Sequence, residues 1–450
     1  MTEIHTLAEF ISGTTFAALS RETTDQVKMH ILDTVGAMLA GAKTPEGAAL
    51  AKLVDRFSPP RNMPVAGDSF RSIMLPTIIA NCGATRCTEI DDIHLESCTT
   101  PGSVIVPTAL ALAKAGYLAD PADFLLSVAL GYELLIRLGM AVNGPEVLYQ
   151  GTWPTYLAAA LGSAAVAARA LALNAQQAAN ALAMALTMSR GAGTRAKNGI
   201  SSRWLILGIA AQNGVIAACA AQEGFVGDEA FIDKTCEQVH GLKVIHKHLS
   251  SDLGQQFLVD QTGIKPYPIG RQALSAVEAF RAILTNHRLE PESIQGVYVQ
   301  VPRQFVSMID HPQLPENRMD TIRSVQYQIA LAAYKPDSLF DVQRANWMVD
   351  DRMRVLMDKI RIKSSEKLAS YYPSLWPAQV RVRIGGKTYS CEMLHPKGDP
   401  DNRFQWDEVI SKFTWVAKPA LDETTIGAIS KVVRNLEAAH SLPKLLELLA

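Results

Sequence analysis

The sequence LAAALGSAAVAARALAL, residues 157–173, decides the fold class of this 450-residue chain. It is rich in alanine, and the small residues Gly162 and Ser163 within it let helix axes approach closely. Residues 178–188 have a similar composition, so the two stretches predict a tight helical core. Helices of this kind, with few charges, must be covered on all sides by the rest of the domain or by a second subunit. We therefore expect a homodimer.

Helix signals extend outward from this core over residues 8–227. Thr44-Pro45-Glu46 predicts an N-cap followed by proline at the first helical position, and Asp120-Pro121 repeats this signal. The helix after Asp120 is expected to run to Leu138 and to end at Gly139. Residues 25–39 carry apolar residues at a spacing close to 3.6, which predicts a helix with one buried face and Gly41 as its C-cap.

The pattern changes after Gly263. Residues 296–301 (GVYVQV) and 379–384 (QVRVRI) alternate and are β-branched, and a Gly385-Gly386 turn leads to a second run at 388–393. These runs predict one strand and one hairpin. Helices are expected at 275–284 and 322–334, so residues 265–395 predict a small α+β domain.

The chain is too long for a single core, which stops growing at about 250–300 residues. We expect a mainly α protein with a smaller α+β domain. Residues 1–264 form the first part of a large helical domain, and 265–395 form the α+β domain. Residues 396–450 return to the helical domain, through a polar linker at 396–404 and helices at 406–413 and 424–449.

Composition excludes several classes of function. The formal net charge is −1, from 43 Lys and Arg against 44 Asp and Glu, so no nucleic-acid partner is expected. The apolar stretches are broken by small residues and the N-terminus lacks a basic, apolar leader, so we expect no membrane span and a cytoplasmic location. The six cysteines show no CxxC pair, so neither a metal site nor a disulfide is expected.

The densest polar cluster is EIDDIHLE at residues 89–96, followed by SCTTPGS at 97–103. Crowded carboxylates beside an imidazole are typical of proton-transfer sites. The alternative is a solvated acidic turn that caps a helix. Metal binding by Asp91, Asp92 and His94 is a weaker alternative, because adjacent carboxylates point in different directions.

Two further clusters carry positive charge. Residues 195–203 combine basic residues, serines and a glycine before a helix, which suits anions such as carboxylates. Residues 265–271 (KPYPIGR) lie at the predicted domain boundary, where ligand sites often occur, and two prolines stiffen their backbone. A charged surface loop and a rigid linker are the respective structural alternatives.

The order and spacing of several segments resemble the MmgE/PrpD family, which includes 2-methylcitrate dehydratases, cis-aconitate decarboxylases and an iminodisuccinate epimerase. The segments span essentially the whole chain. They are 89–107 (EIDDIHLESCTTPGSVIVP), 131–139 (GYELLIRLG), 151–165 (GTWPTYLAAALGSAA), 265–271 (KPYPIGR), 324–327 (SVQY) and 396–413 (PKGDP through KF).

The resemblance implies a helical domain completed by the C-terminal helices, an α+β lid inserted before them, and a dimer. It also implies a cofactor-independent site between the helical domain and the lid. There a carboxylate-bearing substrate loses an α-proton, and then water, carbon dioxide or its configuration.

The chain departs from the family pattern at positions that matter for proton transfer. Two family histidines correspond to Thr100 and Trp153, and the lysine and histidine of a third motif correspond to Arg203 and Ile206. A threonine hydroxyl is no base at neutral pH without a partner, and an indole cannot shuttle protons. Arginine binds carboxylates but does not exchange protons. These changes predict a drier pocket and a non-standard substrate.

These observations give a hypothesis for the site in which a small molecule is bound without a cofactor or a metal. Lys265 is the preferred acid–base group, because burial beside arginines favours a neutral, basic amine. The predicted catalytic residues are Lys265, Tyr327, Asp91, Asp92 and His94, and the predicted substrate-binding residues are Thr100, Trp153, Arg203, Arg271 and Tyr267.

The predicted function is that of a lyase or isomerase that abstracts a proton from a carboxylate- or carbonyl-bearing molecule. Three alternatives stay open at this point. They are standard 2-methylcitrate dehydratase or cis-aconitate decarboxylase activity, a binding protein that kept the fold without the chemistry, and a reaction such as a cyclisation that needs mostly shape.

Overall fold

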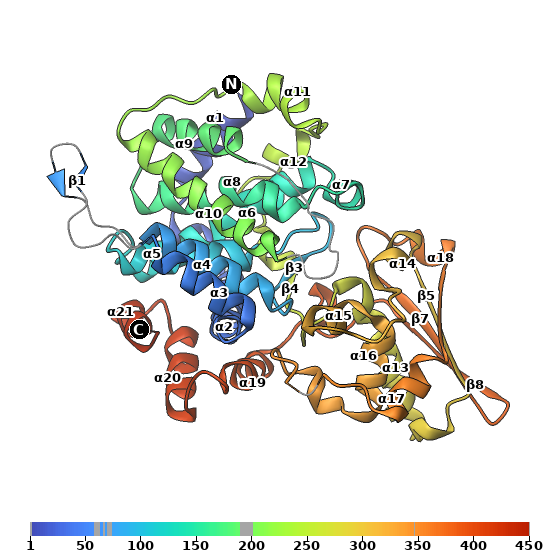
Figure 1. Cartoon of the computed structure of the whole chain (residues 1–450). Coiled ribbons are helices and arrows are strands. Elements are labelled where there is room, and N and C mark those ends of the chain that lie inside the picture. The colour runs from blue at the N-terminus through green and yellow to red at the C-terminus, as the bar shows by residue number, and fades with distance from the viewer. Residues whose placement is uncertain are drawn as a thin grey trace. The chain divides into compact units, whose positions relative to one another are not determined.

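A computed structural model of the chain describes residues 2–57, 64–65, 68–69, 74–189, 201–345 and 347–449. These residues form two compact units (Figure 1). The first unit holds the described residues up to 262 together with 405–449, and the second unit holds 263–404. The basic segment 195–199 lies outside the described residues. The predicted linker at 396–404 belongs to the second unit, where Asp399 pairs with a buried arginine.

The first unit is helical. Its helices are α1 (Glu3–Gly13), α2 (Arg21–Ala42), α3 (Pro45–Asp55), α4 (Met74–Cys87), α5 (Gly102–Lys114), α6 (Pro121–Ala141), α7 (Gly144–Gln150), α8 (Pro154–Ala170), α9 (Ala175–Thr187), α10 (Ser202–Gln222), α11 (Cys236–His240), α12 (Lys247–Ser250), α19 (Trp406–Ala417), α20 (Glu423–Arg434) and α21 (Ser441–Leu448). Shorter elements are η1 (Phe16–Ala18), the π-helix η2 (Phe231–Thr235), η3 (Leu258–Gln261), β1 (Pro64–Val65), β2 (Asp68–Ser69) and β3 (Ile93–His94).

The alanine-rich helix α8 is the centre of the first unit. It is buried along nearly its whole length and packs against α5, α6, α9 and α10. Its contact with α10 is close enough that a Cβ on Gly214 would lie 2.1 Å from the carbonyl oxygen of Ala160. The small side chains thus allow the close helix approach that the sequence predicts.

The predicted helix starts are confirmed, and two predicted helix ends are wrong. Thr44 and Asp120 both cap their helices through side-chain oxygens that accept backbone N–H groups. Gly41 and Gly139 instead lie inside α2 and α6. A Cβ on Gly41 would lie 1.9 Å from the carbonyl oxygen of Ala84, so this glycine serves helix packing and does not end the helix.

The C-terminal segment completes the first unit. Helices α19 and α20 both pack against α2 near the start of the chain. The ammonium of Lys412 on α19 forms an ion pair with Asp33 on α2 and donates to the carbonyl oxygen of Ile90 at 3.2 Å. The single helix expected over 424–449 is two helices, because the backbone turns between Asn435 and His440.

Two helices of the first unit, α6 and α10, are long and apolar enough to cross a membrane by length and composition. The apolar window of α6 is 94% buried inside the protein, as in the core helix of a globular domain, and that of α10 is 56% buried. The exposed positions of α10 include Ile209 and Ile216, two turns apart.

The second unit combines helices with a four-stranded sheet. Its elements are α13 (Arg271–His287), η4 (Pro291–Ser293), β5 (Gly296–Val301), α14 (Arg303–Ile309), α15 (Arg318–Arg323), α16 (Val325–Tyr334), η5 (Pro336–Leu339), α17 (Asp351–Met357), β6 (Ile360–Ser364), α18 (Glu366–Ala369), β7 (Ala378–Ile384), β8 (Lys387–Met393) and η6 (Pro400–Asn402). The short strand β4 (Thr262–Gly263) marks the passage into it.

The sheet has the strand order β6-β5-β7-β8, with β5 parallel to β6 and the other pairs antiparallel. The predicted hairpin is β7 and β8, joined by Gly385 and Gly386, which both adopt positive φ. Alternate residues of β7 are buried and α13 packs against this strand, so one face of the sheet forms a core. A strand that the sequence did not predict, β6, completes the other edge.

The helix predicted over 322–334 is divided at Ser324. This serine accepts the backbone N–H of Tyr327 at 3.1 Å and so caps α16, while α15 ends at Arg323. A side-chain cap of this kind competes with continuous helix, which explains the break.

Candidate functional site

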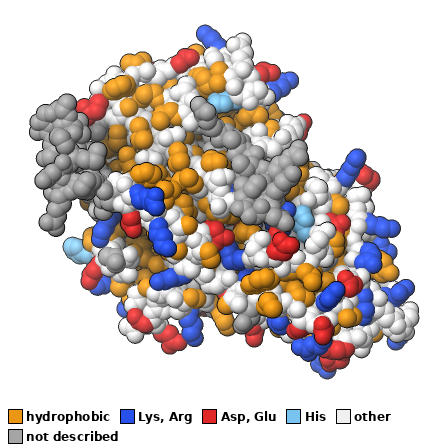
Figure 2. Space-filling view, viewed as in Figure 1, with side chains coloured by type: hydrophobic (Ala, Val, Ile, Leu, Met, Phe, Trp, Pro, Cys, Tyr) orange, Lys and Arg blue, Asp and Glu red, His pale blue; other side chains and the backbone are white. Residues whose placement is uncertain are grey.

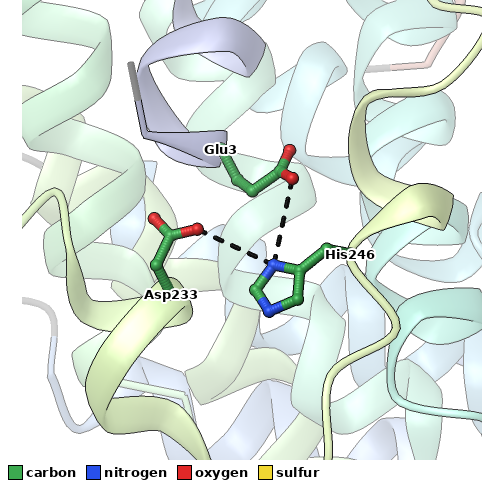
Figure 3. A group of neighbouring side chains, drawn as sticks. All are labelled: Glu3, Asp233 and His246. Atoms are coloured by element: carbon green, nitrogen blue, oxygen red, sulfur yellow. Dashed lines mark ion pairs between the residues drawn. The ribbon is translucent and has the colours of Figure 1, made fainter.

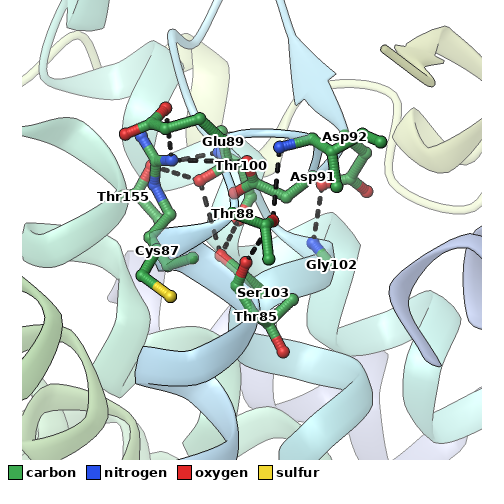
Figure 4. A network of polar contacts seen from close by, with 12 residues as sticks. Thr85, Cys87, Thr88, Glu89, Asp91, Asp92, Thr100, Gly102, Ser103 and Thr155 are labelled. Atoms are coloured by element: carbon green, nitrogen blue, oxygen red, sulfur yellow. Dashed lines mark hydrogen bonds and ion pairs between the residues drawn. The ribbon is translucent and has the colours of Figure 1, made fainter. Parts of the chain in front are cut away.

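The acidic segment at 89–96 lies in the connection between α4 and α5, inside the first unit (Figure 4). Asp91 and Asp92 are fully buried, and Glu89 and His94 are nearly so. The alternative of a solvated acidic turn is therefore wrong. Burial of several carboxylates requires nearby cations or hydrogen-bond donors, and the structure supplies both.

Two buried arginines share the carboxylate of Glu89. The guanidinium of Arg86, from α4, lies 2.7 Å from Glu89 Oε2 and 3.3 Å from Asp91 Oδ1. The guanidinium of Arg203, from α10, lies 3.1 Å from Glu89 Oε1. Glu89 also has φ +57°, a left-handed conformation that is strained for this residue type. Strain combined with shared charge is typical of functional sites, and we call Arg86, Glu89, Asp91 and Arg203 the arginine–carboxylate cluster.

Aromatic rings cover Arg203. Its guanidinium carbon lies 3.7 Å from the ring centre of Trp204 and 5.6 Å from that of Trp153. The phenol of Tyr156 is buried beside the cluster, and burial raises its pKa to about 12 although Arg86 and Arg203 oppose this rise. Tyr156 is therefore a neutral phenol at physiological pH. Trp153 thus joins an aromatic wall around a cation, and its role in substrate binding stays a prediction.

Asp92 anchors the start of α5. Its Oδ1 accepts the backbone N–H of Gly102 at 2.9 Å, and its Oδ2 accepts the hydroxyl of Tyr132 at 2.7 Å. The Nδ1 atom of His30 lies 3.1 Å from the same Oδ2. A Cβ on Gly102 would lie 2.8 Å from this carboxylate and from the Tyr132 hydroxyl, so only glycine fits here. These contacts give Asp92 a positioning role.

No motif in the sequence marks His30 or Tyr132 as part of the site. His30 is fully buried on α2 between apolar neighbours, where a histidine more often serves packing. Burial raises the pKa of Tyr132 well above its ordinary value, and the charge of Asp92 adds to this. The phenol therefore keeps its proton and remains a donor to Asp92.

His94 forms hydrogen bonds within the loop that follows it, to Ser97 and Thr99. Its Nδ1 accepts the backbone N–H of Ser97 at 3.3 Å and lies 3.0 Å from the Ser97 hydroxyl, while its backbone N–H donates to the carbonyl of Thr99 at 2.8 Å. Burial lowers the pKa of the imidazole to about 4, against the effects of Gln261 and Asp92. The ring is thus neutral at physiological pH.

Thr100 belongs to a group of hydroxyls. Its backbone N–H donates to Thr155 Oγ1 at 3.0 Å, and its own Oγ1 lies 3.3 Å from Thr155 Oγ1 and 3.5 Å from Ser103 Oγ (Figure 4). Hydroxyls do not accept protons at neutral pH without a base. Thr100 thus occupies a buried hydrogen-bonding position.

The predicted residues Arg271 and Tyr267 have partners within the second unit. Arg271 Nη2 lies 2.7 and 2.5 Å from the two oxygens of Asp399, and both side chains are buried. The Tyr267 hydroxyl donates to Glu278 at 2.8 Å. Burial raises the pKa of Tyr267 well above its ordinary value. Both contacts hold the second unit together, and substrate binding by these residues stays a prediction.

Lys265 and Tyr327 are both buried in the second unit. The Tyr327 hydroxyl donates to the carbonyl oxygen of Trp347 at 3.1 Å, and burial raises the pKa of this phenol to about 12. The phenol of Tyr327 therefore keeps its proton and donates a hydrogen bond to this carbonyl. The contribution of Lys265 and Tyr327 to a common site stays a prediction.

Models of one family match both parts of the chain. The MmgE/PrpD N-terminal domain matches residues 5–240, and the MmgE/PrpD C-terminal domain matches residues 267–438. The chain belongs to the MmgE/PrpD family. The resemblance seen in the sequence is confirmed, as is the mainly α fold with a smaller α+β part.

Three similar proteins of this family show the kind of reaction that it includes. A cis-aconitate decarboxylase-like protein of Aspergillus oryzae is 23% identical over 94% of this chain and 92% of its own. Cis-aconitate decarboxylases of Aspergillus terreus and Homo sapiens are 23% and 24% identical, over 94% and 96% of this chain and 91% of their own. These relatives support a lyase-type enzyme at the level of the family.

Proposed function

We propose that this protein is a cofactor-independent lyase or isomerase that abstracts a proton from a carboxylate- or carbonyl-bearing small molecule. We further propose that its substrate is neither cis-aconitate nor 2-methylcitrate. One observation carries the second part: Thr100 lies among hydroxyls and Trp153 lies against a guanidinium, and neither side chain accepts a proton at neutral pH. The loss of one acid–base group costs about 10²–10⁴ in rate, so two such losses favour different chemistry.

The arginine–carboxylate cluster supports binding of an anion. Arg203 carries a fixed positive charge, and the surrounding tryptophan rings reduce its contact with water. A substrate carboxylate would compete with Glu89 for this guanidinium, and Arg86 would keep Glu89 paired during the exchange. We propose that Arg203 holds the substrate in this way.

Lys265 and Tyr327 are the proposed proton-transfer groups. A buried amine can act as the base. The Tyr327 phenol would donate to the developing oxyanion after its hydroxyl leaves the Trp347 carbonyl. Asp92 and His94 act in this proposal by positioning, because Asp92 holds the start of α5 and His94 holds the 94–99 loop. Asp91 acts through its contact with Arg86. Thr100 then presents its hydroxyl to the substrate from that fixed loop.

Exchange of substrate protons with solvent tests this proposal without knowledge of the product. The protein is incubated in D2O with a set of small 2-keto, 2-hydroxy and unsaturated carboxylic acids, and NMR follows the loss of carbon-bound proton signals. We expect at least one acid to exchange or react. Lys265→Ala and Tyr327→Phe should slow this by about 10²–10⁴-fold.

Two matched variants control for general effects of the substitutions. Lys367→Ala and Tyr298→Phe change exposed residues of the same types in the same unit and should leave the rate unchanged. Full activity in both Lys265→Ala and Tyr327→Phe would remove the proposal.

The standard reactions remain the main alternative, since the named relatives are cis-aconitate decarboxylases. Assays with cis-aconitate, 2-methylcitrate and citrate distinguish the two cases. Turnover of these acids at a rate above that of every other acid would favour the alternative. Binding of an acid without any exchange or turnover would instead favour a binding protein that kept the fold.

We also propose a cytoplasmic homodimer. The exposed Ile209 and Ile216 lie on one side of α10, where a second copy could cover them. Light scattering during size-exclusion chromatography measures the mass directly, and Ile209→Lys with Ile216→Lys should shift a dimer toward the monomer. A monomeric wild-type protein at micromolar concentration would contradict the dimer.

A further inference from the structure

Three side chains from distant parts of the sequence converge in the first unit and are partly exposed (Figure 3). Glu3 lies in the first turn of α1, Asp233 in the π-helix η2, and His246 immediately before α12. The Nδ1 atom of His246 lies 3.9 Å from Glu3 Oε1 and 3.7 Å from Asp233 Oδ1. One ligand atom from each residue lies within 4.8 Å of the others.

These separations are too long for direct hydrogen bonds, which join N and O at about 2.7–3.2 Å. They are closer to the spacing of atoms that share one metal ion. Bonds of about 2.0–2.2 Å to a tetrahedral zinc ion place neighbouring ligand atoms roughly 3.3–3.6 Å apart. The two distances to His246 would need to shorten by a few tenths of an ångström to reach that spacing, and the two carboxylate oxygens, which lie within 4.8 Å of each other, would have to approach as well. We propose that Glu3, Asp233 and His246 form a binding site for a divalent transition-metal ion.

The donor set indicates which cation the site would take. One imidazole nitrogen and two carboxylates suit a borderline metal such as Zn²⁺, whereas Ca²⁺ takes six to eight oxygen ligands. Two carboxylates also balance the charge of a divalent cation when the imidazole is neutral. Water would complete the coordination, because all three side chains are partly exposed, at 19%, 25% and 44%.

The surroundings of the site favour a structural role for the ion. The chain between α10 and η3 contains only short helices, and one of them is a π-helix, a rare element that is frequent at functional sites. The same two segments meet again at His5 and Glu229, whose Nδ1 and Oε2 atoms lie 3.4 Å apart. A metal ion on Glu3, Asp233 and His246 would therefore fasten α1 to this part of the chain. This role is independent of the proposed reaction.

Zinc titration of the full chain tests the site. The metal-free protein competes with a chromophoric chelator for Zn²⁺, and thermal unfolding is followed with Zn²⁺ and with EDTA. We expect one zinc equivalent that raises the unfolding midpoint. His246→Ala and Asp233→Asn should each weaken its affinity at least about tenfold and abolish the effect of EDTA on unfolding.

His395→Ala is the matched control, because His395 and Asp401 form a partly exposed pair that has no third ligand close by among the described residues. This variant should bind zinc as the wild type does. The proposal is overturned if the zinc affinity and stoichiometry are the same in all variants. It is also overturned if His246→Ala lowers stability equally with and without EDTA, since the three residues would then form ion pairs only.

Discussion

The two units of this protein each bury arginines beside carboxylates, but they arrange them differently. In the second unit, Arg271 faces the two oxygens of Asp399 in a pair. In the first unit, Arg86 and Arg203 share Glu89, and Arg86 also contacts Asp91. The Arg271–Asp399 pair joins α13 to the segment at 396–404, and neither residue has a strained backbone. The arginine–carboxylate cluster of the first unit contains the strained Glu89.

Buried charge can serve either stability or function, depending on how many partners each charged group has. When one member of a buried ion pair is removed, the remaining charge has no opposite charge beside it. A carboxylate shared by two arginines, such as Glu89, stays paired with one of them when the other binds a different group. We therefore expect the Arg271 pair to dominate stability and the arginine–carboxylate cluster to dominate activity.

The largest expected effect is that of Arg271→Ala. It leaves the buried Asp399 without its cation, and such losses cost about 3–5 kcal/mol of unfolding free energy. Denaturant unfolding measures this loss, and Arg271→Ala with Asp399→Asn should recover part of it. Arg281→Ala, which breaks a half-exposed pair with Glu278, should cost about 1 kcal/mol or less. Equal losses of unfolding free energy in Arg271→Ala and Arg281→Ala would contradict a larger contribution of the Arg271 pair to stability.

Acid should weaken the first unit through His94. The pKa of this imidazole is lowered to about 4 in the folded protein and is about 6.5 when unfolded, so the unfolded chain binds more protons between these values. The contribution of His94 is complete above pH 6.5 and falls as the pH drops toward 4, by about 3 kcal/mol. Unfolding free energies measured from pH 7 to 4 check this.

His94→Gln should flatten that acid-dependent loss, because glutamine keeps polar groups at this position but does not titrate. His287→Gln, which changes an exposed histidine, should leave the loss as in the wild type. An unchanged pH dependence in His94→Gln would assign the acid sensitivity to other groups.

Arg203→Ala separates activity from stability in the arginine–carboxylate cluster. Turnover of the substrate found by exchange should fall about 10²-fold, because the proposed anion-binding charge is lost, which corresponds to about 2.7 kcal/mol. The unfolding free energy should fall by only about 1–2 kcal/mol, since Arg86 still pairs with Glu89. Arg169→Ala, at the surface, is the control for both measurements.

One outcome for Arg203→Ala would contradict the functional role of the arginine–carboxylate cluster. Unchanged turnover with a stability loss as large as that of Arg271→Ala would show that the cluster serves the fold alone.

The smallest change in stability is expected among the hydroxyl side chains that surround Thr100. Thr155→Val removes the acceptor for the Thr100 backbone N–H and should cost about 1–2 kcal/mol, with the loss measured by denaturant unfolding. Thr414→Val removes a hydroxyl that bonds only within its own helix and should have an effect near zero. A neutral Thr155→Val would mean that another group satisfies that N–H.

Local signals made much of the fold predictable. Thr44 and Asp120 act on neighbouring residues, and the alternation in 296–301 reflects a strand with one buried face, so each could be deduced from a few residues. The roles of Gly41 and Gly139 could not, because they depend on which helix packs against each glycine. A glycine in a close helix contact and a glycine at a helix end look alike in sequence.

The candidate site was predictable only in part for the same reason. The segment 89–103 stands out by composition, but its partners come from α2, α4, α6 and α10. His30, Tyr132 and Arg86 lie in helices whose sequence pattern shows burial without showing what each polar side chain meets. Physical contact between distant segments, and not residue type, makes these three part of the site.

The pairing of Lys412 with Asp33 has a consequence for synthesis of the protein. This cation reaches the ribosome's exit only after the intervening α+β unit has been translated, yet its partner lies near the start of the chain. Until then Asp33 lacks the ammonium with which it pairs in the finished protein, and the Ile90 carbonyl lacks the same donor. The first unit therefore gains the contacts of Lys412 only after the second unit has been synthesised.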